Sequence, residues 1–212
     1  MTRGRFIAFE GGEGMGKSTQ ARMLAESLRE SGLTVTLTRE PGGTPGAEAI
    51  RELLLAPPGS GWTMEAEALL FAAARADHVA HSIRPALDDG GWVICDRFID
   101  SSRAYQGVAG EMGDDEIMGL HAFGSDGLMP DLTIMIEAPQ DIVSARLAAR
   151  DGDNSDAIGG RTSSYHAAVN DAFRDLATRE PERFAIVDGA GSIEDVHRRV
   201  LSEVARRLGT SE

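Results

Sequence analysis

The hydrophobic residues of the chain form five short runs, separated by longer segments with helical periodicity. The runs lie at Phe6–Phe9, Val35–Leu37, Trp92–Cys95, Leu132–Ile136 and Phe184–Val187. None shows the regular alternation of a strand with one solvated face. Each is therefore predicted to be a strand that is buried on both faces.

The segments between these runs are predicted to be helices. After residue 17, Ala21, Leu24 and Leu28 share one helical face, and Gly32 is a suitable C-terminal stop. Further helices are expected at 47–55, 64–87, 139–150, 162–179 and 192–208, with 64–87 as one long helix.

The alternation of strands and helices predicts the fold class. Strands that are buried on both faces and separated by helices indicate a three-layer α/β fold with a five-stranded parallel sheet. A length of 212 residues favours a single domain. The polar, glycine-rich stretch 151–160 is expected to be a mobile surface loop.

Composition and charge limit the kinds of partner. The chain has 21 basic and 34 acidic residues, a net charge of −13, so its overall field does not favour nucleic acid. Small phosphorylated ligands remain compatible, because helix N-termini and a few cations hold them locally.

The single cysteine and the histidines indicate the cellular setting. Cys95 excludes an internal disulfide and fits a reducing compartment. No apolar stretch approaches the ~20 residues of a membrane span. We therefore expect a cytoplasmic protein with no membrane partner. The five histidines show no metal-ligand spacing with Cys95, so no zinc site is assigned.

A glycine-rich segment between the first strand and the first helix matches the phosphate-loop pattern G-x-x-x-x-G-K-[ST]. Lys17 in this segment is the only lysine, since the other 20 of the 21 basic residues are arginines. Its ammonium is expected to reach the β- and γ-phosphates of ATP. The expected ATP-binding residues are Gly11, Gly12, Glu13, Gly14, Met15, Gly16, Lys17, Ser18 and Thr19.

Asp96 directly follows the third hydrophobic run. Its carboxylate is placed to reach the water shell of a Mg²⁺ ion that the Ser18 hydroxyl ligates, or a substrate hydroxyl. A strand-terminal aspartate can also cap the next helix. Together with the phosphate loop, the functional role is favoured.

The reaction class follows by exclusion. A guanine-reading Asn-Lys-x-Asp element cannot exist with Lys17 as the only lysine, and large motor ATPases need a longer chain. A small kinase remains, and it needs cations and an aromatic slot for its second substrate at the carboxyl ends of the strands. The candidates are Arg39, Arg51, Phe71, Arg75, Arg97 and Tyr105.

Four sequence blocks add a specific resemblance. They are Phe9–Gln20, Thr38–Gly43, Leu69–Ala73 and Asp96–Gly107. With these blocks the sequence resembles the bacterial thymidylate kinase family of phosphate-loop nucleoside monophosphate kinases over nearly its whole length. The resemblance implies a homodimer that uses ATP and Mg²⁺ to convert dTMP to dTDP, a step in dTTP synthesis.

The resemblance implies roles at the thymidine end of the site. Phe71 would stack on the thymine ring, and Arg75 would donate to O4. Ser102 and Gln106 are similar to base-edge contacts, and Tyr105 to a ring that crowds the sugar C2′. Without the resemblance, Phe71 also fits a core aromatic and Arg75 a solvated helix face.

The resemblance also implies roles at the phosphate end. Glu13 would hold the 3′-hydroxyl region, and Arg97 would bridge the dTMP phosphate and the transferring phosphoryl group. Glu40 and Arg51 match positions near the substrate phosphate and the metal, or are ordinary surface charges. Because the attacking phosphate is already ionised, no strong general base is required, and Asp96 is expected to act on the metal or on orientation.

Two positions depart from the family pattern. Ala74 stands where the family has an aspartate, and Asp77 is a possible replacement. The expected lid, at about 147–162, lacks the usual arginine. Since Met15 is not basic, a transition-state arginine should come from the lid. We hypothesise that it is Arg150, with Arg161 and Arg146 as the other candidates.

The sequence leaves two alternative functions and two interpretations of one apolar segment. The first alternative is a kinase for another monophosphate, such as dUMP or a purine nucleotide, and the second is a non-enzymatic ATP-binding switch of the same fold. The apolar segment 66–80 fits a dimer face and core burial equally well.

Overall fold

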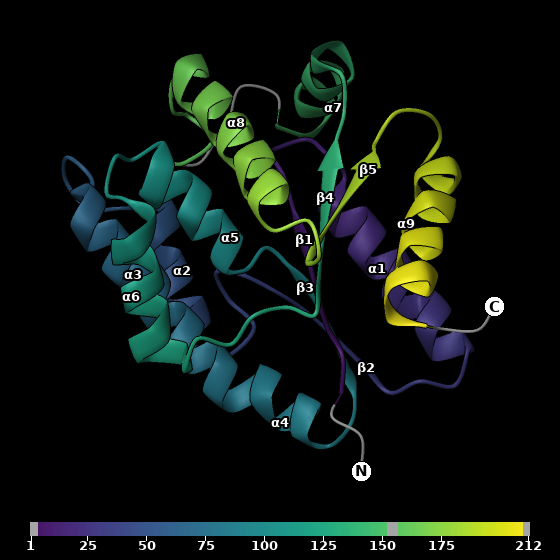
Figure 1. The fold of residues 1–212 in the computed structure, drawn as a ribbon. Helices are drawn as coiled ribbons and strands as arrows, with labels where there is room; N and C mark the ends of the chain where they lie inside the picture. Colours follow the sequence, from purple (N-terminus) through teal and green to yellow (C-terminus); the bar gives the residue numbers. More distant parts are fainter. Residues whose placement is uncertain (1–3, 152–156, 210–212) are drawn as a thin grey trace.

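The chain forms one five-stranded parallel sheet in the order β2-β3-β1-β4-β5 (Figure 1). This computed structural model describes residues 4–151 and 157–209. The strands are β1 (Phe6–Glu10), β2 (Val35–Arg39), β3 (Trp92–Asp96), β4 (Leu132–Glu137) and β5 (Phe184–Asp188). The predicted fold class and all five predicted strands are confirmed.

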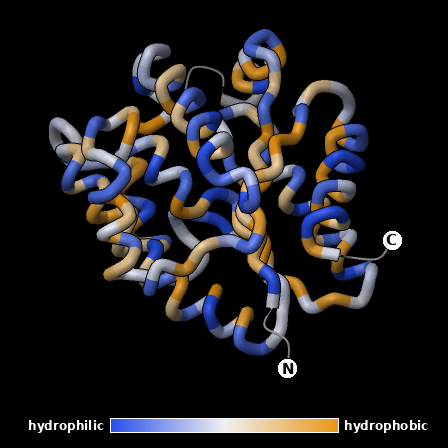
Figure 2. Tube along the Cα trace, viewed as in Figure 1, coloured by the Kyte–Doolittle hydropathy of each residue, from blue (hydrophilic) through white to orange (hydrophobic). Residues whose placement is uncertain are grey.

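β1 is the central strand, and its side chains explain why the hydrophobic runs lack alternation. Ile7 and Phe9 join one core cluster, whereas Phe6 and Ala8 join a second cluster. Both faces of the strand are therefore buried, and an apolar residue is favoured at every position. Figure 2 shows hydrophobic residues concentrated along the strands in the middle of the molecule.

Helices cover both faces of the sheet (Figure 1). α1 (Lys17–Glu30) and α9 (Ile193–Leu208) pack together against one face. The opposite side carries α2 (Pro45–Leu55), α3 (Met64–His78), α4 (Arg84–Asp88), α5 (Ile99–Ser102) and α6 (Asp114–Ser125). α8 (Ser163–Arg179) packs on the β4–β5 part of the sheet, where Phe173 and Leu176 share a core cluster with Met135 and Phe184. α7 (Gln140–Asp151) lies near the carboxyl end of β4, and the predicted lid falls between α7 and α8 (Figure 1). No described helix is long and apolar enough to cross a membrane.

The predicted single helix over 64–87 is wrong in one respect. α3 ends at His78, a π-helical turn spans Val79–Ile83, and α4 then begins at Arg84. Pro85 sits in the first turn of α4. A proline has no N–H and its ring clashes with the carbonyl four residues earlier, so a regular helix cannot run through it unchanged. The wider turn before Pro85 accommodates this clash.

The segment 99–125 was not predicted to be helical, yet the structure contains α5, a π-helical stretch Arg103–Val108 and α6 there. The first two bury polar side chains, Asp100, Arg103 and Gln106 among them, so they lack an apolar stripe. α6 does carry a start signal, the three acidic residues of its first turn.

We predict that stability depends on the two-sided burial of the sheet. Ile134→Ala on β4, where the isoleucine is fully buried, should lower the free energy of unfolding by about 2–5 kcal/mol. Ile186→Ala on the neighbouring strand β5, where the side chain is 54% exposed, should cost at most about 1 kcal/mol. Chemical denaturation measures both, and equal losses would contradict the burial pattern.

Candidate active site

All five strands end in a charged residue at the same edge of the sheet. These residues are Glu10, Arg39, Asp96, Glu137 and Asp188. A cavity of about 470 Å³ opens at this edge. It is lined by all nine residues that the resemblance assigns to dTMP, together with Lys17, Ser18 and Asp96. The structure therefore brings the predicted donor and acceptor residues into one site, as expected for the carboxyl edge of a parallel sheet.

The phosphate loop connects β1 to α1, as predicted. Gly11, Gly14 and Gly16 have positive φ angles, which glycine adopts without strain. A Cβ on Gly14 would lie 3.0 Å from Leu147 and 3.1 Å from Val143, so α7 packs directly on the loop. The loop thus leads into the N-terminus of a helix, where backbone N–H groups and the helix dipole favour an anion.

Lys17, the first residue of α1, is buried at the base of this loop. Its ammonium donates to the carbonyl of Gly12 at 2.6 Å. Burial, together with the nearby positive charge of Arg97, lowers the pKa of Lys17 to about 7. A multiply charged phosphate beside the ammonium would reverse that shift, because an adjacent negative charge favours the protonated form.

Ser18 and Asp96 form the predicted metal position. The Ser18 hydroxyl donates to Asp96 Oδ2 at 2.5 Å, and the other carboxylate oxygen of Asp96 is buried without a hydrogen-bond partner in the described part of the chain. An acceptor-only oxygen in that position fits a hydrated Mg²⁺ ion, which typically uses one or two protein oxygens plus substrate phosphates. Among the described residues there is no group of three or more His, Cys, Asp or Glu side chains arranged to hold a metal.

Arg97 connects the phosphate loop to the second half of the cavity. Its Nη1 donates to the Gly11 carbonyl at 3.2 Å and to the Ser101 hydroxyl at 3.1 Å. The guanidinium lies 5.2 Å from the centre of the Tyr105 ring. The backbone of Arg97 has a φ of 70°, a costly conformation for a residue with a side chain. This backbone turn follows β3 directly and places the side chain between the phosphate loop and the Tyr105 ring.

Arg75, which also lines the cavity, is held in place by a buried acid. Its Nε donates to Glu40 at 2.7 Å and its Nη2 to the Ser102 hydroxyl at 2.9 Å. The second oxygen of Glu40 lies 3.0 Å from His78 Nδ1. Both oxygens of Glu40 are therefore engaged, and the structure gives Glu40 a positioning role toward Arg75 in addition to its predicted place near the substrate phosphate.

The three candidate lid arginines have different surroundings. The side chain of Arg150 lies outside the described residues. Arg161 is paired with Glu67 and bonded to the Tyr165 hydroxyl. Arg146 donates to the Gly189 carbonyl at 3.0 Å and lies beside the phosphate loop, since its Nη1 would be 3.8 Å from a Cβ on Gly16.

Asp77, the suggested replacement for the acid missing at Ala74, accepts a hydrogen bond from the Thr44 hydroxyl. Thr44 is the residue that caps α2. Asp77 therefore fixes the start of α2.

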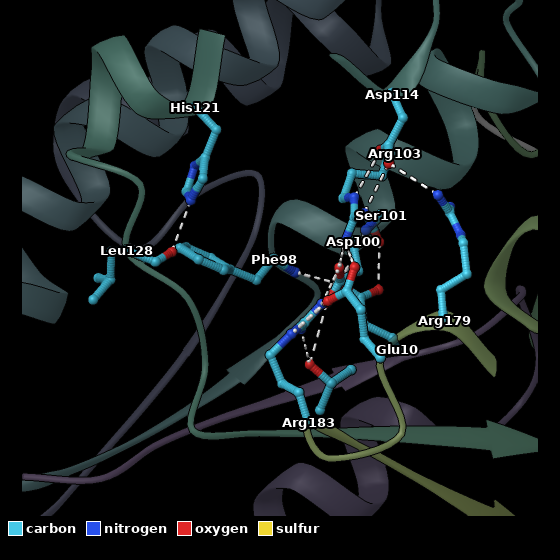
Figure 3. Close-up of polar contacts among 12 residues, drawn as sticks. Glu10, Phe98, Asp100, Ser101, Arg103, Asp114, His121, Leu128, Arg179 and Arg183 are labelled. Atoms are coloured by element: carbon cyan, nitrogen blue, oxygen red, sulfur yellow. Dashed lines mark hydrogen bonds and ion pairs between the residues drawn. The ribbon is translucent and has the colours of Figure 1, made fainter. Parts of the chain in front are cut away.

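Sequence reasoning missed a layer of buried charge beneath α5. Glu10 accepts hydrogen bonds from the Phe98 amide at 2.8 Å and from the Ser101 hydroxyl at 2.6 Å (Figure 3). Burial, together with the nearby carboxylate of Asp100, raises the pKa of Glu10 to about 7. The available signal was an acid that directly follows a buried strand. Glu10 fixes the turn that presents Arg97.

Asp100 anchors α5 from the other side. Arg183, just before β5, donates to its two oxygens at 2.6 and 2.9 Å, and Arg103 approaches at 3.1 Å (Figure 3). Arg103 also makes a bidentate pair with Asp114 on α6. The helix that carries Ser101 and Ser102 is thus tied to the sheet and to α6 by buried ion pairs.

We predict that the ion pairs of Asp100 with Arg183 and Arg103 contribute to the stability of the fold. Arg183→Met leaves the fully buried Asp100 with one cation fewer and should lower the free energy of unfolding by about 3 kcal/mol. Arg174→Met removes a pair with Glu137 in which the arginine is 58% exposed, and should cost less than about 1 kcal/mol. Denaturant unfolding measures the free energy of unfolding of both variants. Similar decreases would show that the buried ion pairs of Asp100 stabilise the fold no more than an exposed pair does.

We also predict proton uptake when a nucleoside triphosphate binds. At pH 8 a Lys17 with a pKa near 7 is mostly neutral, and bound phosphates raise the pKa again, so about 0.5–1 proton should be taken up. For the same reason affinity should fall as the pH rises above 7. Calorimetry of ATP binding in two buffers of different ionisation enthalpy measures the uptake. Lys17→Arg, which stays charged, should show none, and equal uptake in both proteins would refute the assignment.

The chain is similar to known proteins over nearly its whole length. A family model described as thymidylate kinase matches residues 9–200. A thymidylate kinase of Rhizorhabdus wittichii is 52% identical, covering 97% of this chain and 99% of the relative. One from Symbiobacterium thermophilum is 45% identical, covering 95% and 94%. A crystal structure of thymidylate kinase from Ehrlichia chaffeensis superposes with a TM-score of 0.78 at 33% identity, covering 95% and 99%. The chain belongs to the thymidylate kinase family.

Proposed function

We propose that this protein transfers the γ-phosphoryl group of ATP to dTMP, giving ADP and dTDP on the route to dTTP. The observation that carries this proposal is that one cavity at the sheet edge is lined by both the expected donor residues and the expected acceptor residues. Lys17 and Ser18 of the phosphate loop share its lining with Phe71 and Arg75 of α3, and Arg97 contacts both the Gly11 carbonyl and the Tyr105 ring. A phosphoryl donor and a pyrimidine monophosphate therefore fit with their phosphates facing each other.

The donor is held by the phosphate loop and the start of α1. Backbone N–H groups and the Lys17 ammonium bind the β- and γ-phosphates, where negative charge develops as the bond to the β-phosphate breaks. Mg²⁺, when bound at Ser18 and Asp96, supplies further neutralisation of the phosphate charge. Lys17 is pre-positioned for this task by its hydrogen bond to Gly12.

The transfer itself needs alignment rather than proton removal. An oxygen of the dTMP phosphate, already ionised at neutral pH, forms a bond to the γ-phosphorus as the bond to the bridging oxygen of ADP breaks. Arg97 can donate to both phosphate groups through its planar fork. Its position is fixed by Gly11, Ser101 and the Tyr105 ring, so little reorganisation is required.

The acceptor is recognised by side chains at the far end of the cavity. Phe71 offers a face for the thymine ring, and Arg75 offers N–H donors for O4. Tyr105 crowds the sugar C2′, Glu13 holds the 3′-hydroxyl region, and Arg51 lies toward the substrate phosphate. These roles come from the family, and the position of all five side chains on the cavity wall supports them.

The remaining proposals concern organisation. The chain acts as a single cytoplasmic domain with a lid at about 147–162. Two copies associate through the face formed by α3 and α6, which pack on each other. Supporting this face, Leu69 on α3 is 57% exposed and Phe123 on α6 is 93% exposed, and large exposed apolar side chains mark contact surfaces.

The substrate assignment predicts a preference among monophosphates. Coupled ADP-release assays should show turnover with dTMP above dUMP, because burial of the 5-methyl group contributes ~0.8 kcal/mol, about fourfold in kcat/KM. Purine monophosphates should give little turnover. A preference for another monophosphate would identify that nucleotide as the substrate in place of dTMP. ATP binding without acceptor-dependent turnover would indicate a switch protein.

The lid hypothesis predicts a separate effect. Arg150→Ala should lower kcat by about 10³ or more, the usual contribution of an arginine that stabilises a phosphoryl-transfer transition state. The matched variants Arg146→Ala and Arg161→Ala should have smaller effects on kcat. A kcat within about threefold of the parent protein for Arg150→Ala would remove this residue from catalysis.

A further inference from the structure

Glu67 on α3 is a buried acid that lies behind the wall of the cavity. It is 6% exposed, and Gln106, the residue in front of it, is 1% exposed. Gln106 Nε2 donates to Glu67 Oε1 at 2.8 Å, and Arg161 from the end of the lid pairs with Oε2. Gln106 lines the cavity, whereas Glu67 does not. Glu67 therefore acts on the cavity only through its two partners.

This contact fixes which end of the Gln106 amide faces the cavity. A carboxylate only accepts hydrogen bonds, so the amide NH₂ must point to Glu67. The reversed amide would place its oxygen against the Glu67 oxygen, which is repulsive and leaves a buried acceptor unpaired. Gln106 is thus held with its carbonyl oxygen as the group that it offers to the cavity.

Arg161 supplies a positive charge that offsets the free-energy cost of burying the Glu67 carboxylate. The guanidinium also lies 4.6 Å from the centre of the Tyr165 ring. The Tyr165 hydroxyl in turn donates to the backbone carbonyl of Tyr105 at 2.7 Å, next to Gln106 in the chain. The C-terminal end of the predicted lid and the part of the cavity expected to hold the nucleobase are therefore joined by one set of contacts.

The resulting pattern is an acceptor from Gln106 and donors from Arg75. It matches a pyrimidine with a ring N–H and an adjacent carbonyl, as at N3 and O4 of thymine and uracil. Cytosine presents the reverse at both positions, an acceptor at N3 and an amino donor at C4. A fixed amide rejects cytosine because mismatched buried groups stay unpaired, whereas a freely turning amide would tolerate either ring.

We propose that Glu67 is a specificity-determining positioning residue, which excludes cytosine nucleotides by locking the orientation of the Gln106 amide. The inference rests on the proposed function and extends it to a residue that does not touch the substrate. It assigns Glu67 an effect on the choice of base rather than on phosphoryl transfer.

The test is Glu67→Gln, whose amide can donate to or accept from Gln106 and so releases the lock. The ratio of kcat/KM for dTMP to that for dCMP should fall about tenfold or more, through KM with little change in kcat. Glu65→Gln, an exposed position two residues away on α3, is the matched control and should keep the parental ratio.

A second background shows whether Glu67 acts through Gln106. In Gln106→Leu the amide is gone, so adding Glu67→Gln should change the ratio no further. If Glu67→Gln does not fold, as judged by thermal unfolding, Glu67→Asp replaces it, because the shorter acid retreats from Gln106 and should also lower the ratio.

The outcomes separate the two proposals. A parent protein that fails to phosphorylate dTMP would overturn the proposed function, and calorimetric affinities for dTMP and dCMP would then replace the kinetic ratio. An unchanged ratio in the folded Glu67 variant, or an equal fall in the Gln106→Leu background, would overturn the role of Glu67 and leave the kinase assignment intact.

Discussion

The structure depends on the burial of opposite charges at one edge of a hydrophobic sheet. Lys17 and Arg75 are almost completely buried there, and burying a cation is costly unless an anion compensates it. Arg75 has Glu40 at 2.7 Å, whereas the direct partner of Lys17 is the neutral carbonyl of Gly12. Lys17 is therefore a buried amine with no carboxylate bonded directly to it among the described residues, and a bound phosphate would supply the anion that favours its charged form.

Behind these groups lies a second layer that does not line the cavity. Glu10, Asp100 and Glu67 are buried acids, and each holds a segment that presents substrate residues. Glu10 and Asp100 hold α5 against the strands, and Glu67 joins α3 to the end of the lid. Catalysis by alignment requires such rigidity, because small displacements of Arg97 or Gln106 would change the reaction or its specificity.

The sequence predicted the strands well, but each prediction ended one or two residues early. The apolar run stops where Glu10, Asp96 or Asp188 begins, and these polar strand ends lie at the site edge. The π-helical turn before Pro85 and the polar helices of 99–108 were also not predicted, because long-range contacts override the local sequence pattern there. The cavity residues were found through motifs. Pairs such as Asp100–Arg183 and Glu67–Arg161, more than 80 positions apart, have no sequence pattern that marks them.

The most direct test is the affinity of a ligand in which adenosine and thymidine are joined through five phosphates. If one charge-balanced groove holds both nucleotides, this ligand should bind at least about tenfold more tightly than ATP or dTMP alone. Lys17→Met and Arg97→Met should each weaken it by about tenfold or more, whereas Arg174→Met should not. Calorimetry measures these affinities. A ligand that binds no better than ATP, or is indifferent to Lys17 and Arg97, would contradict the account.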